Sequence, residues 1–191
     1  MVCIMEVEMS KIAIFLAVGF EEIEAVSTID VLRRGGMVVD MISVSGNLDV
    51  EGAHGISLKC DRLFYNVDYT EYEVLVLPGG MPGADNLNKH EGLTDLLPEF
   101  IKSGKKIAAI CAAPMILGRL GLLEGLEAIC YPGFESELEG ARISEKPVVT
   151  DGSVITAKGA GVAMHFALEI LKWFLPVNEV AALKTKTILE H

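Results

Sequence analysis

The sequence predicts an α/β protein, a doubly wound sandwich in which helices cover both faces of a mostly parallel sheet. Two observations lead to this fold class. Short apolar runs alternate along the chain with longer segments in which apolar residues recur at helical spacing. The runs also lack the polar–apolar alternation of a half-exposed strand, which indicates strands buried on both faces. With 191 residues, 51% of them hydrophobic, the chain can build a full core.

Strands are expected wherever an apolar run lies between turn residues. The expected strands are residues 11–17, 37–44, 73–77, 106–110 and 126–130, and the pair 147–150 and 153–156. The last pair forms a hairpin because Asp151-Gly152 lies between its strands. Glycines within residues 46–56 predict another hairpin, or a loop with short strands, and residues 58–68 are irregular with a brief strand at their start.

Helices are expected where apolar residues recur at helical spacing: 21–34, 84–87, 91–103, 112–120, 132–138 and 161–174. Gly35-Gly36 ends the first helix, and Pro176 ends the last. Pro98 predicts a kink or a restart within the third helix. Pro114 lies in the first turn of the fourth, where a missing N–H removes no hydrogen bond. Right-handed crossovers then bring the loops that follow the parallel strands to one edge of the sheet.

We expect residues 10–176 to form a single domain and residues 177–191 to form a partly helical tail. The terminal Leu189-Glu190-His191 matches the first residues of a vector-encoded histidine tag, so we leave it out of the fold. Met5 and Met9 are alternative starts to Met1. No internal repeat, charge block or linker divides the chain.

Charge and composition exclude several classes of partner. The formal net charge of −11 argues against nucleic acid or an anionic membrane as the main partner. No stretch approaches the ~20 apolar residues of a membrane span, and residues 1–10 lack the pattern of a secretion signal. The four cysteines include no C-x-x-C pair, so we expect no metal site and a reducing, cytoplasmic location.

Cys111 lies at the junction between the predicted strand 106–110 and the helix that follows it. Small residues, Ala109 and Ala113, stand two places either side, as in the nucleophile elbow of hydrolases. The partial positive charge of the helix start is worth about 1–2 kcal/mol and would lower a thiol pKa from about 8.5 to about 7. Cys111 is therefore a candidate nucleophile. The alternative is a small buried apolar residue, as most free cysteines are.

Two further loops are expected to meet Cys111 at the same edge of the sheet. The first carries Glu21, Glu22 and Glu24. Spacing alone does not say which of them, if any, faces Cys111, because acids in a first helical turn also complement the helix dipole. The second contains Gly79-Gly80, whose N–H groups either face an oxyanion or form a plain turn.

Other candidate residues carry weaker patterns. His54 is the one histidine we consider for a site, because the other internal histidines fall at or within predicted helices. Tyr131 ends a predicted strand and is a candidate for the same sheet edge. Gly159 and Gly161 precede a helix but lack the lysine or acid of a phosphate-binding motif, so we expect a turn with tight helix packing there.

Four motifs together resemble the ThiJ/PfpI superfamily, in particular its DJ-one branch of small cytoplasmic proteins with a reactive cysteine. In chain order they are Gly19-Phe20-Glu21-Glu22-Ile23-Glu24, Leu77-Pro78-Gly79-Gly80-Met81-Pro82-Gly83-Ala84, Ala108-Ala109-Ile110-Cys111-Ala112-Ala113-Pro114, and Lys158-Gly159-Ala160-Gly161 with Phe166-Ala167-Leu168. Each motif is modest alone, but their order makes the resemblance specific across residues 11–174. The resemblance implies a flavodoxin-like three-layer sandwich, a homodimer, and chemistry without a cofactor.

The resemblance also selects among the candidate residues. The family's acid that faces the reactive cysteine matches Glu24, and in the family this carboxyl is protonated and hydrogen-bonded to the sulfur. The backbone N–H groups that match Gly80 and Ala112 would form an oxyanion hole. His54 and Arg34 fall near positions that line the pocket, or the dimer interface beside it, in relatives.

One departure from the family weighs against proteolysis. Many relatives place a histidine near the cysteine just after the next strand, where this chain has Tyr131. The peptidase branch has a histidine directly after its cysteine, where this chain has Ala112. A Cys-His dyad is therefore not supported, and Glu24 would carry proton transfer alone.

Two functions from different classes fit these residues. The first is a glutathione-independent glyoxalase or deglycase that acts on small reactive aldehydes such as methylglyoxal, or on glycated adducts, through a hemithioacetal on Cys111. The second is a non-enzymatic redox sensor or stress-protective, chaperone-like protein in which Cys111 is oxidised. We favour the enzyme.

Overall fold

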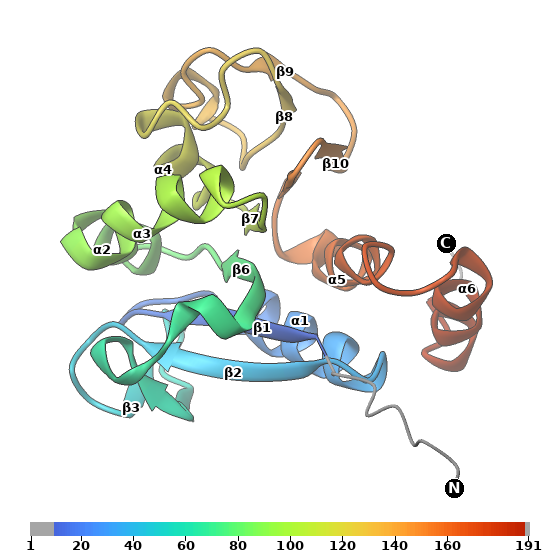
Figure 1. Ribbon diagram of the computed structural model, residues 1–191, viewed down its shortest axis with the longest axis horizontal. Coiled ribbons are helices and arrows are strands. Elements are labelled where there is room, and N and C mark those ends of the chain that lie inside the picture. Colours follow the sequence, from blue (N-terminus) through green and yellow to red (C-terminus); the bar gives the residue numbers. More distant parts are fainter. Residues whose placement is uncertain (1–9, 190–191) are drawn as a thin grey trace, which may run out of the picture.

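The computed structural model describes residues 10–189 (Figure 1). Its main sheet has seven strands in the order β10-β11-β7-β6-β1-β2-β5. They are β1 (Lys11–Leu16), β2 (Val38–Ser43), β5 (Arg62–Leu63), β6 (Tyr72–Leu77), β7 (Lys106–Ile110), β10 (Val148–Asp151) and β11 (Val154–Ala157). All neighbours are parallel except β10 and β11, which form the expected antiparallel hairpin. The mostly parallel sheet is therefore confirmed.

Helices cover both faces of the sheet, as a three-layer sandwich requires. One layer contains α1 (Glu22–Arg34), α5 (Ala163–Leu171) and α6 (Val177–Lys186). The other contains α2 (Gly83–Lys89), α3 (Glu91–Lys102) and α4 (Pro114–Arg119). Within β1, Ile12 and Ile14 pack under the first layer, whereas Ala13 and Phe15 pack under the second. This burial on both faces explains why the apolar runs show no polar alternation.

The remaining elements are short. The expected glycine-rich hairpin consists of β3 (Asp49–Glu51) and β4 (Ser57–Lys59). A second small sheet pairs β8 (Glu127–Ala128) with β9 (Arg142–Ile143). Single turns of 3₁₀-helix occur at η1 (Phe64–Asn66), η2 (Tyr69–Glu71), η3 (Glu135–Glu137) and η4 (Ala160–Val162). Pro98 lies inside a continuous α3, and α6 gives the tail the helix expected of it.

Three predicted elements differ from the structure. The strand expected at 126–130 is only the two-residue β8 and lies outside the main sheet, where β11 already pairs with β10 and β7. The Ile129 N–H instead donates to the Thr156 side-chain hydroxyl at 2.9 Å. The helix expected from Pro132 is prevented by Gly133, whose φ of +98° lies outside the helical region, and only η3 forms. The helix expected after Gly161 starts with η4 and ends at Leu171, short of Phe174.

The topology brings the chain segments of interest together. β1, β6, β7 and β11 run parallel, so the loops after their carboxyl ends lie along one edge of the sheet. The β3–β4 hairpin joins this edge through an isolated bridge between Phe20 and Gly52. Among residues 10–189, no helix is long and apolar enough to cross a membrane. The proposed starts among residues 1–9, and Glu190 and His191 of the expected tag, lie outside the described residues.

Candidate active site

Cys111 connects β7 to α4 with a backbone φ of +65°, in the left-handed region that an L side chain rarely adopts. Two hydrogen bonds hold this conformation: the Cys111 N–H donates to the Ala157 carbonyl at 2.9 Å, and the Cys111 carbonyl accepts from the Tyr131 N–H at 2.8 Å. Strained residues of this kind persist only where their surroundings fix them, and they concentrate at functional sites. The expected passage from strand to elbow to helix is present at Cys111.

Glu24 comes from the first turn of α1 and is fully buried, with 0% of its surface exposed. Its Oε2 atom accepts a hydrogen bond from the Gly79 N–H at 2.8 Å, whereas Oε1 is buried without a hydrogen-bond partner. The Glu21 carboxylate caps the helix by accepting from the Glu24 N–H at 2.6 Å, which fixes the turn that carries Glu24. The Glu24 carboxyl therefore has one oxygen free to hold a proton.

Gly79 permits the close approach of Cys111 and Glu24. A Cβ atom on Gly79 would lie 2.6 Å from Cys111 Cβ and 2.8 Å from Glu24 Oε2, which is too close for either contact to survive. Gly80 is restricted as well, because its φ is +88° and a Cβ there would lie 2.4 Å from the backbone nitrogen of Glu21. The three loops predicted to meet at this edge do meet.

Burial and mutual repulsion control the ionisation of the pair. Burial raises the pKa of Glu24 to about 7, against the opposing effects of the Gly79 N–H hydrogen bond and of the nearby Cys111 thiol. Burial, together with the charge of Glu24 and a hydrogen bond to it, raises the pKa of the Cys111 thiol to about 12. Hydrogen bonds from the backbone N–H groups of Gly80 and Ala112 lower that pKa in part. Above about pH 7 the pair therefore shares one proton and carries one negative charge.

The expected lowering of the Cys111 pKa is wrong while Glu24 is ionised. A helix start at Cys111 was expected to favour the thiolate, but α4 begins only at Pro114. Burial and the Glu24 carboxylate also oppose the two backbone N–H groups. The balance changes with the position of the shared proton. When the carboxyl keeps the proton, its repulsion of a thiolate disappears, and the two N–H groups then face burial alone.

Tyr131 and Gly159 border the sulfur of Cys111. A Cβ on Gly159 would lie 3.9 Å from Cys111 Sγ and 3.4 Å from Tyr131 Cδ2, so Gly159 lies between them. Both residues line a cavity of ≈ 370 Å³ with Lys158 and the η4 segment. The expected turn at Gly159 is present, but the residue's place at the sulfur was missed. Its position after β11 was the available signal, because the carboxyl end of this strand lies at the same sheet edge.

His54 lies beside Glu22. The His54 ring Nδ1 is 2.7 Å from Glu22 Oε2, and its backbone N–H donates to Glu22 Oε1 at 2.6 Å. The hydrogen bond and charge of Glu22 raise the pKa of the exposed His54. Burial alone would raise the pKa of Glu22, but hydrogen bonds from His54 and from the Ile56 N–H lower it. His54 thus reaches the predicted sheet edge, where its partner is Glu22.

Arg34 lies at the opposite end of α1 from Glu24, ten residues and about 15 Å along the helix. Its Nε is 2.5 Å from Asp30 Oδ2, and this ion pair raises the pKa of the guanidinium. Arg34 also lines a separate groove of ≈ 210 Å³ with residues of α6. The described chain does not bring Arg34 to Cys111.

One group of side chains within residues 10–189 has the composition of a metal site: Glu21, Glu22 and His54, with ligand atoms within 4.8 Å of one another. These atoms already have other partners. Glu21 accepts from the Glu24 N–H, and Glu22 and His54 hydrogen-bond directly to each other. We therefore assign this group to fastening the β3–β4 hairpin onto the start of α1.

The sequence profile of the DJ-1/PfpI family matches residues 10–173. The chain belongs to the DJ-1/PfpI family. This confirms the resemblance found in the four motifs. The chain is 38% identical to Protein DJ-1 homolog B of Arabidopsis thaliana over 167 aligned residues. The alignment covers 86% of this chain. The chain spans only about two fifths of the length of the Arabidopsis relatives that it matches.

Two further DJ-1/PfpI relatives match along most of their own length. The chain is 35% identical over 153 residues to Glutathione-independent glyoxalase DJR-1.2 of Caenorhabditis elegans, covering 80% of this chain and 81% of the relative. The fold matches the structure of Toxoplasma gondii DJ-1, oxidized, with a TM-score of 0.90 and 34% identity. That match covers 94% of this chain and 98% of the other. These matches confirm the predicted α/β architecture.

Proposed function

We propose that this protein is a glutathione-independent glyoxalase that converts methylglyoxal and related reactive aldehydes to hydroxy acids. The observation that carries this proposal is the buried Glu24 carboxyl, which has one oxygen without a partner and lies across Gly79 from the strained Cys111. Burial also raises the pKa of Glu24 to about 7, near the value at which a group gives and takes protons equally well at neutral pH. The relative named as a glyoxalase supports the same activity.

The reaction needs only these groups. Cys111 sulfur adds to the aldehyde carbon and forms a C–S bond, while the proton of the pair passes to the aldehyde oxygen and gives a hemithioacetal. The backbone N–H groups of Gly80 and Ala112 stabilise negative charge that develops on oxygen. Glu24 removes the proton from this carbon and returns it to the neighbouring carbon. The hydroxyl proton passes from the first oxygen to the second through the enediol, which yields a thioester of the hydroxy acid. Water then hydrolyses the thioester and restores the thiol.

No external oxidant or cofactor enters this scheme. One carbon is oxidised and its neighbour is reduced by the same two electrons, so the isomerisation balances within the substrate. In an adduct of methylglyoxal with an amine, Cys111 sulfur would form the C–S bond while the C–N bond breaks and the amine leaves with the proton of the pair. This gives the same hemithioacetal, so glycated substrates belong to the same proposal. The cavity beside Tyr131 and Gly159 leaves room for the larger leaving group. Its mouth is partly open, since Tyr131 is 50% exposed.

Proteolysis is disfavoured on two grounds. Tyr131 and Ala112 stand where histidines would be needed, and His54 is bonded to Glu22. We further propose that the protein acts in the cytoplasm as a homodimer. Ile23, Val26 and Ile56 support the dimer, because these large apolar side chains are 57%, 44% and 56% exposed. They lie on α1 and on the hairpin fastened to its start, and such patches mark interfaces.

The decisive experiment measures lactate formed from methylglyoxal by the pure protein without glutathione. Cys111→Ser should abolish lactate formation, because the hydroxyl is a far weaker nucleophile than the thiol. Cys60→Ser is the matched control, since Cys60 is a buried cysteine of the same core but belongs to the loop after β4. Equal rates in the wild type and in Cys111→Ser would refute the proposal.

The alternative function is a redox sensor or stress-protective protein that acts through oxidation of Cys111. A protonated Glu24 would stabilise a sulfinate by donating a hydrogen bond to it, and the similar structure from T. gondii is of oxidized DJ-1. Mass spectrometry after mild peroxide treatment separates the two functions. Two added oxygens confined to Cys111, without aldehyde turnover, favour the sensor. Oxidation spread evenly over Cys3, Cys60 and Cys130 excludes it.

A further inference from the structure

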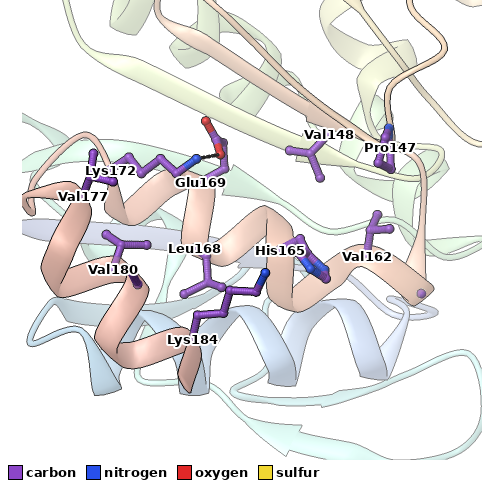
Figure 2. A pocket seen from close by; sticks show the side chains of 12 residues that line it. Pro147, Val148, Val162, His165, Leu168, Glu169, Lys172, Val177, Val180 and Lys184 are labelled. Atoms are coloured by element: carbon purple, nitrogen blue, oxygen red, sulfur yellow. Dashed lines mark hydrogen bonds and ion pairs between the residues drawn. The ribbon is translucent and has the colours of Figure 1, made fainter. Parts of the chain in front are cut away.

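A groove of ≈ 610 Å³ lies between α5, α6 and the start of β10 (Figure 2). This volume falls within the range of small-molecule sites, about 300–1,000 Å³. Its walls are aliphatic, from Val148, Val162, Leu168, Val177 and Val180. Among the described residues that line it, His165 carries the one aromatic ring, and there is no Phe, Tyr or Trp. The groove therefore suits an alkyl chain better than a nucleotide base, which would have a single small ring to stack on.

The polar residues of the groove leave it with a positive end. Its one acid, Glu169, is already bound on both oxygens, by Lys172 at 2.5 Å and by the Thr150 hydroxyl at 3.1 Å. Lys184 has no carboxylate partner within residues 10–189. Figure 2 shows the Lys184 side chain running from α6 past Leu168 toward the His165 ring on α5. Lys184 and His165 both line the groove, so an ammonium group and an imidazole face the same apolar space.

We propose that this groove binds a free fatty acid of medium chain length. The alkyl chain lies along the valine and leucine walls, and the carboxylate lies between Lys184 and His165, which donate hydrogen bonds to it. Charge complementarity selects this ligand, because the groove has two lysines, Lys172 and Lys184, and one acid, Glu169, which is already paired with Lys172. A neutral apolar ligand would leave the lysine without a partner.

The groove is separate from Cys111, which does not line it. Gly161 and Val162 of η4 stand between it and the cavity beside Tyr131. The proposal therefore does not rest on the glyoxalase reaction, and a Cys111→Ser protein tests the two independently. That variant should bind the fatty acid as tightly as the wild type even though it forms no lactate.

The experiment uses the full chain and a dansyl-labelled undecanoic acid, whose fluorescence rises on entering an apolar site. We expect saturable binding, displacement by dodecanoate, and no displacement by methyl dodecanoate or by propionate. Lys184→Gln should weaken binding about tenfold, the loss of one charged hydrogen bond. Lys186→Gln is the matched control, because Lys186 is also on α6 but lines the other groove, with Arg34. It should leave the affinity unchanged.

A second variant fills the groove. Ala181 is exposed on α6 and lines the groove, so Ala181→Trp should abolish binding while leaving the melting temperature close to that of the wild type. Three outcomes would overturn the proposal: no saturable binding by the wild type, equal affinity in Lys184→Gln and Lys186→Gln, or unchanged binding in Ala181→Trp. Displacement by methyl dodecanoate as effective as by dodecanoate would also overturn it. Loss of binding in Cys111→Ser would indicate that the ligand binds at the Cys111 site and would refute binding in the separate groove.

Discussion

Glu22 and Glu24 stand two residues apart in the first turn of α1, both buried, and they have opposite pKa shifts. Glu22, 5% exposed, accepts hydrogen bonds from two backbone N–H groups and the His54 ring, which outweigh burial and lower its pKa. Glu24, 0% exposed, accepts one well-formed bond, from Gly79, and burial raises its pKa to about 7. The number of hydrogen-bond donors that meet a buried carboxylate thus decides whether its pKa falls or rises.

The largest expected difference between these two acids is in catalysis. Glu24→Gln should lower the rate of lactate formation about a thousandfold, because an amide cannot carry a proton between carbons. Glu22→Gln should lower it less than about threefold, since Glu22 holds the hairpin and touches no reacting atom. The measurement is lactate production at saturating methylglyoxal, with circular dichroism as the check on folding. Equal losses in the two variants would show that the contrast between the acids is only structural.

The next effect is a difference in the pH dependence of stability. The folded pKa of Glu24 is raised from 4.5 to about 7, so its contribution is fully present below pH 4.5 and is lost as the pH rises through 7, by about 3 kcal/mol. Glu22 behaves oppositely: its contribution is present above pH 4.5 and is lost as the pH falls through its lowered folded pKa. Urea unfolding of both glutamine variants across this range measures each slope. Parallel curves for the two variants would contradict the assignment.

Gly79→Ala tests whether the thiol and carboxyl need their close approach. The added methyl group would lie 2.6 Å from Cys111 Cβ and 2.8 Å from Glu24 Oε2, so we expect 1–3 kcal/mol of destabilisation, roughly the cost of overpacking, and loss of lactate formation. Gly161→Ala is the control, because a Cβ there meets nothing within 4 Å. It should change the free energy of unfolding by less than about 0.5 kcal/mol. A Gly79→Ala protein with normal activity would show that the two groups work apart.

The smallest effect locates the shared proton. Labelling of Cys111 by iodoacetamide should rise through about pH 7 in the wild type, where the pair gains its negative charge. Glu24→Gln keeps a donor and should remain reactive, whereas Glu24→Asp withdraws the carboxyl and should react about tenfold more slowly. Labelling that rises near pH 8.5, the pKa of a free thiol, would show that Cys111 is an ordinary cysteine that only packs in the core. If Cys111 were labelled only near pH 12, the shared proton would lie on the sulfur and not on the carboxyl.

Local patterns predicted most of the fold because buried strands and helix ends leave direct traces in the sequence. Residues 106–110 and Asp151-Gly152 are examples, and both elements form where expected. Predictions failed where a distant or conformational constraint decided the outcome. Gly133 adopts a positive φ that prevents a helix from starting at Pro132. The Ile129 N–H donates to the hydroxyl of Thr156, 27 residues further along the chain. Neither constraint is visible in a local window.

The site divides in the same way. The position of Cys111 between strand and helix was predictable, but which of the three glutamates lies beside it was not. Their roles depend on partners far along the chain: Glu22 bonds to the hairpin at His54, and Glu24 bonds to Gly79. Spacing within one helical turn contains no information about such partners, and the family resemblance supplied it.

The two hydrogen bonds that hold the Cys111 backbone come from Tyr131 and Ala157, residues that the ribosome adds later. A nascent chain that ends before β11 lacks the Ala157 carbonyl, so it cannot hold Cys111 at φ +65° against the cost of about 1–3 kcal/mol. Until β11 is synthesised, the backbone of Cys111 lacks one of the two hydrogen bonds that hold its positive φ. The left-handed backbone of Cys111 is therefore held by both hydrogen bonds only after β11 has paired with β7, when most of the chain has been synthesised.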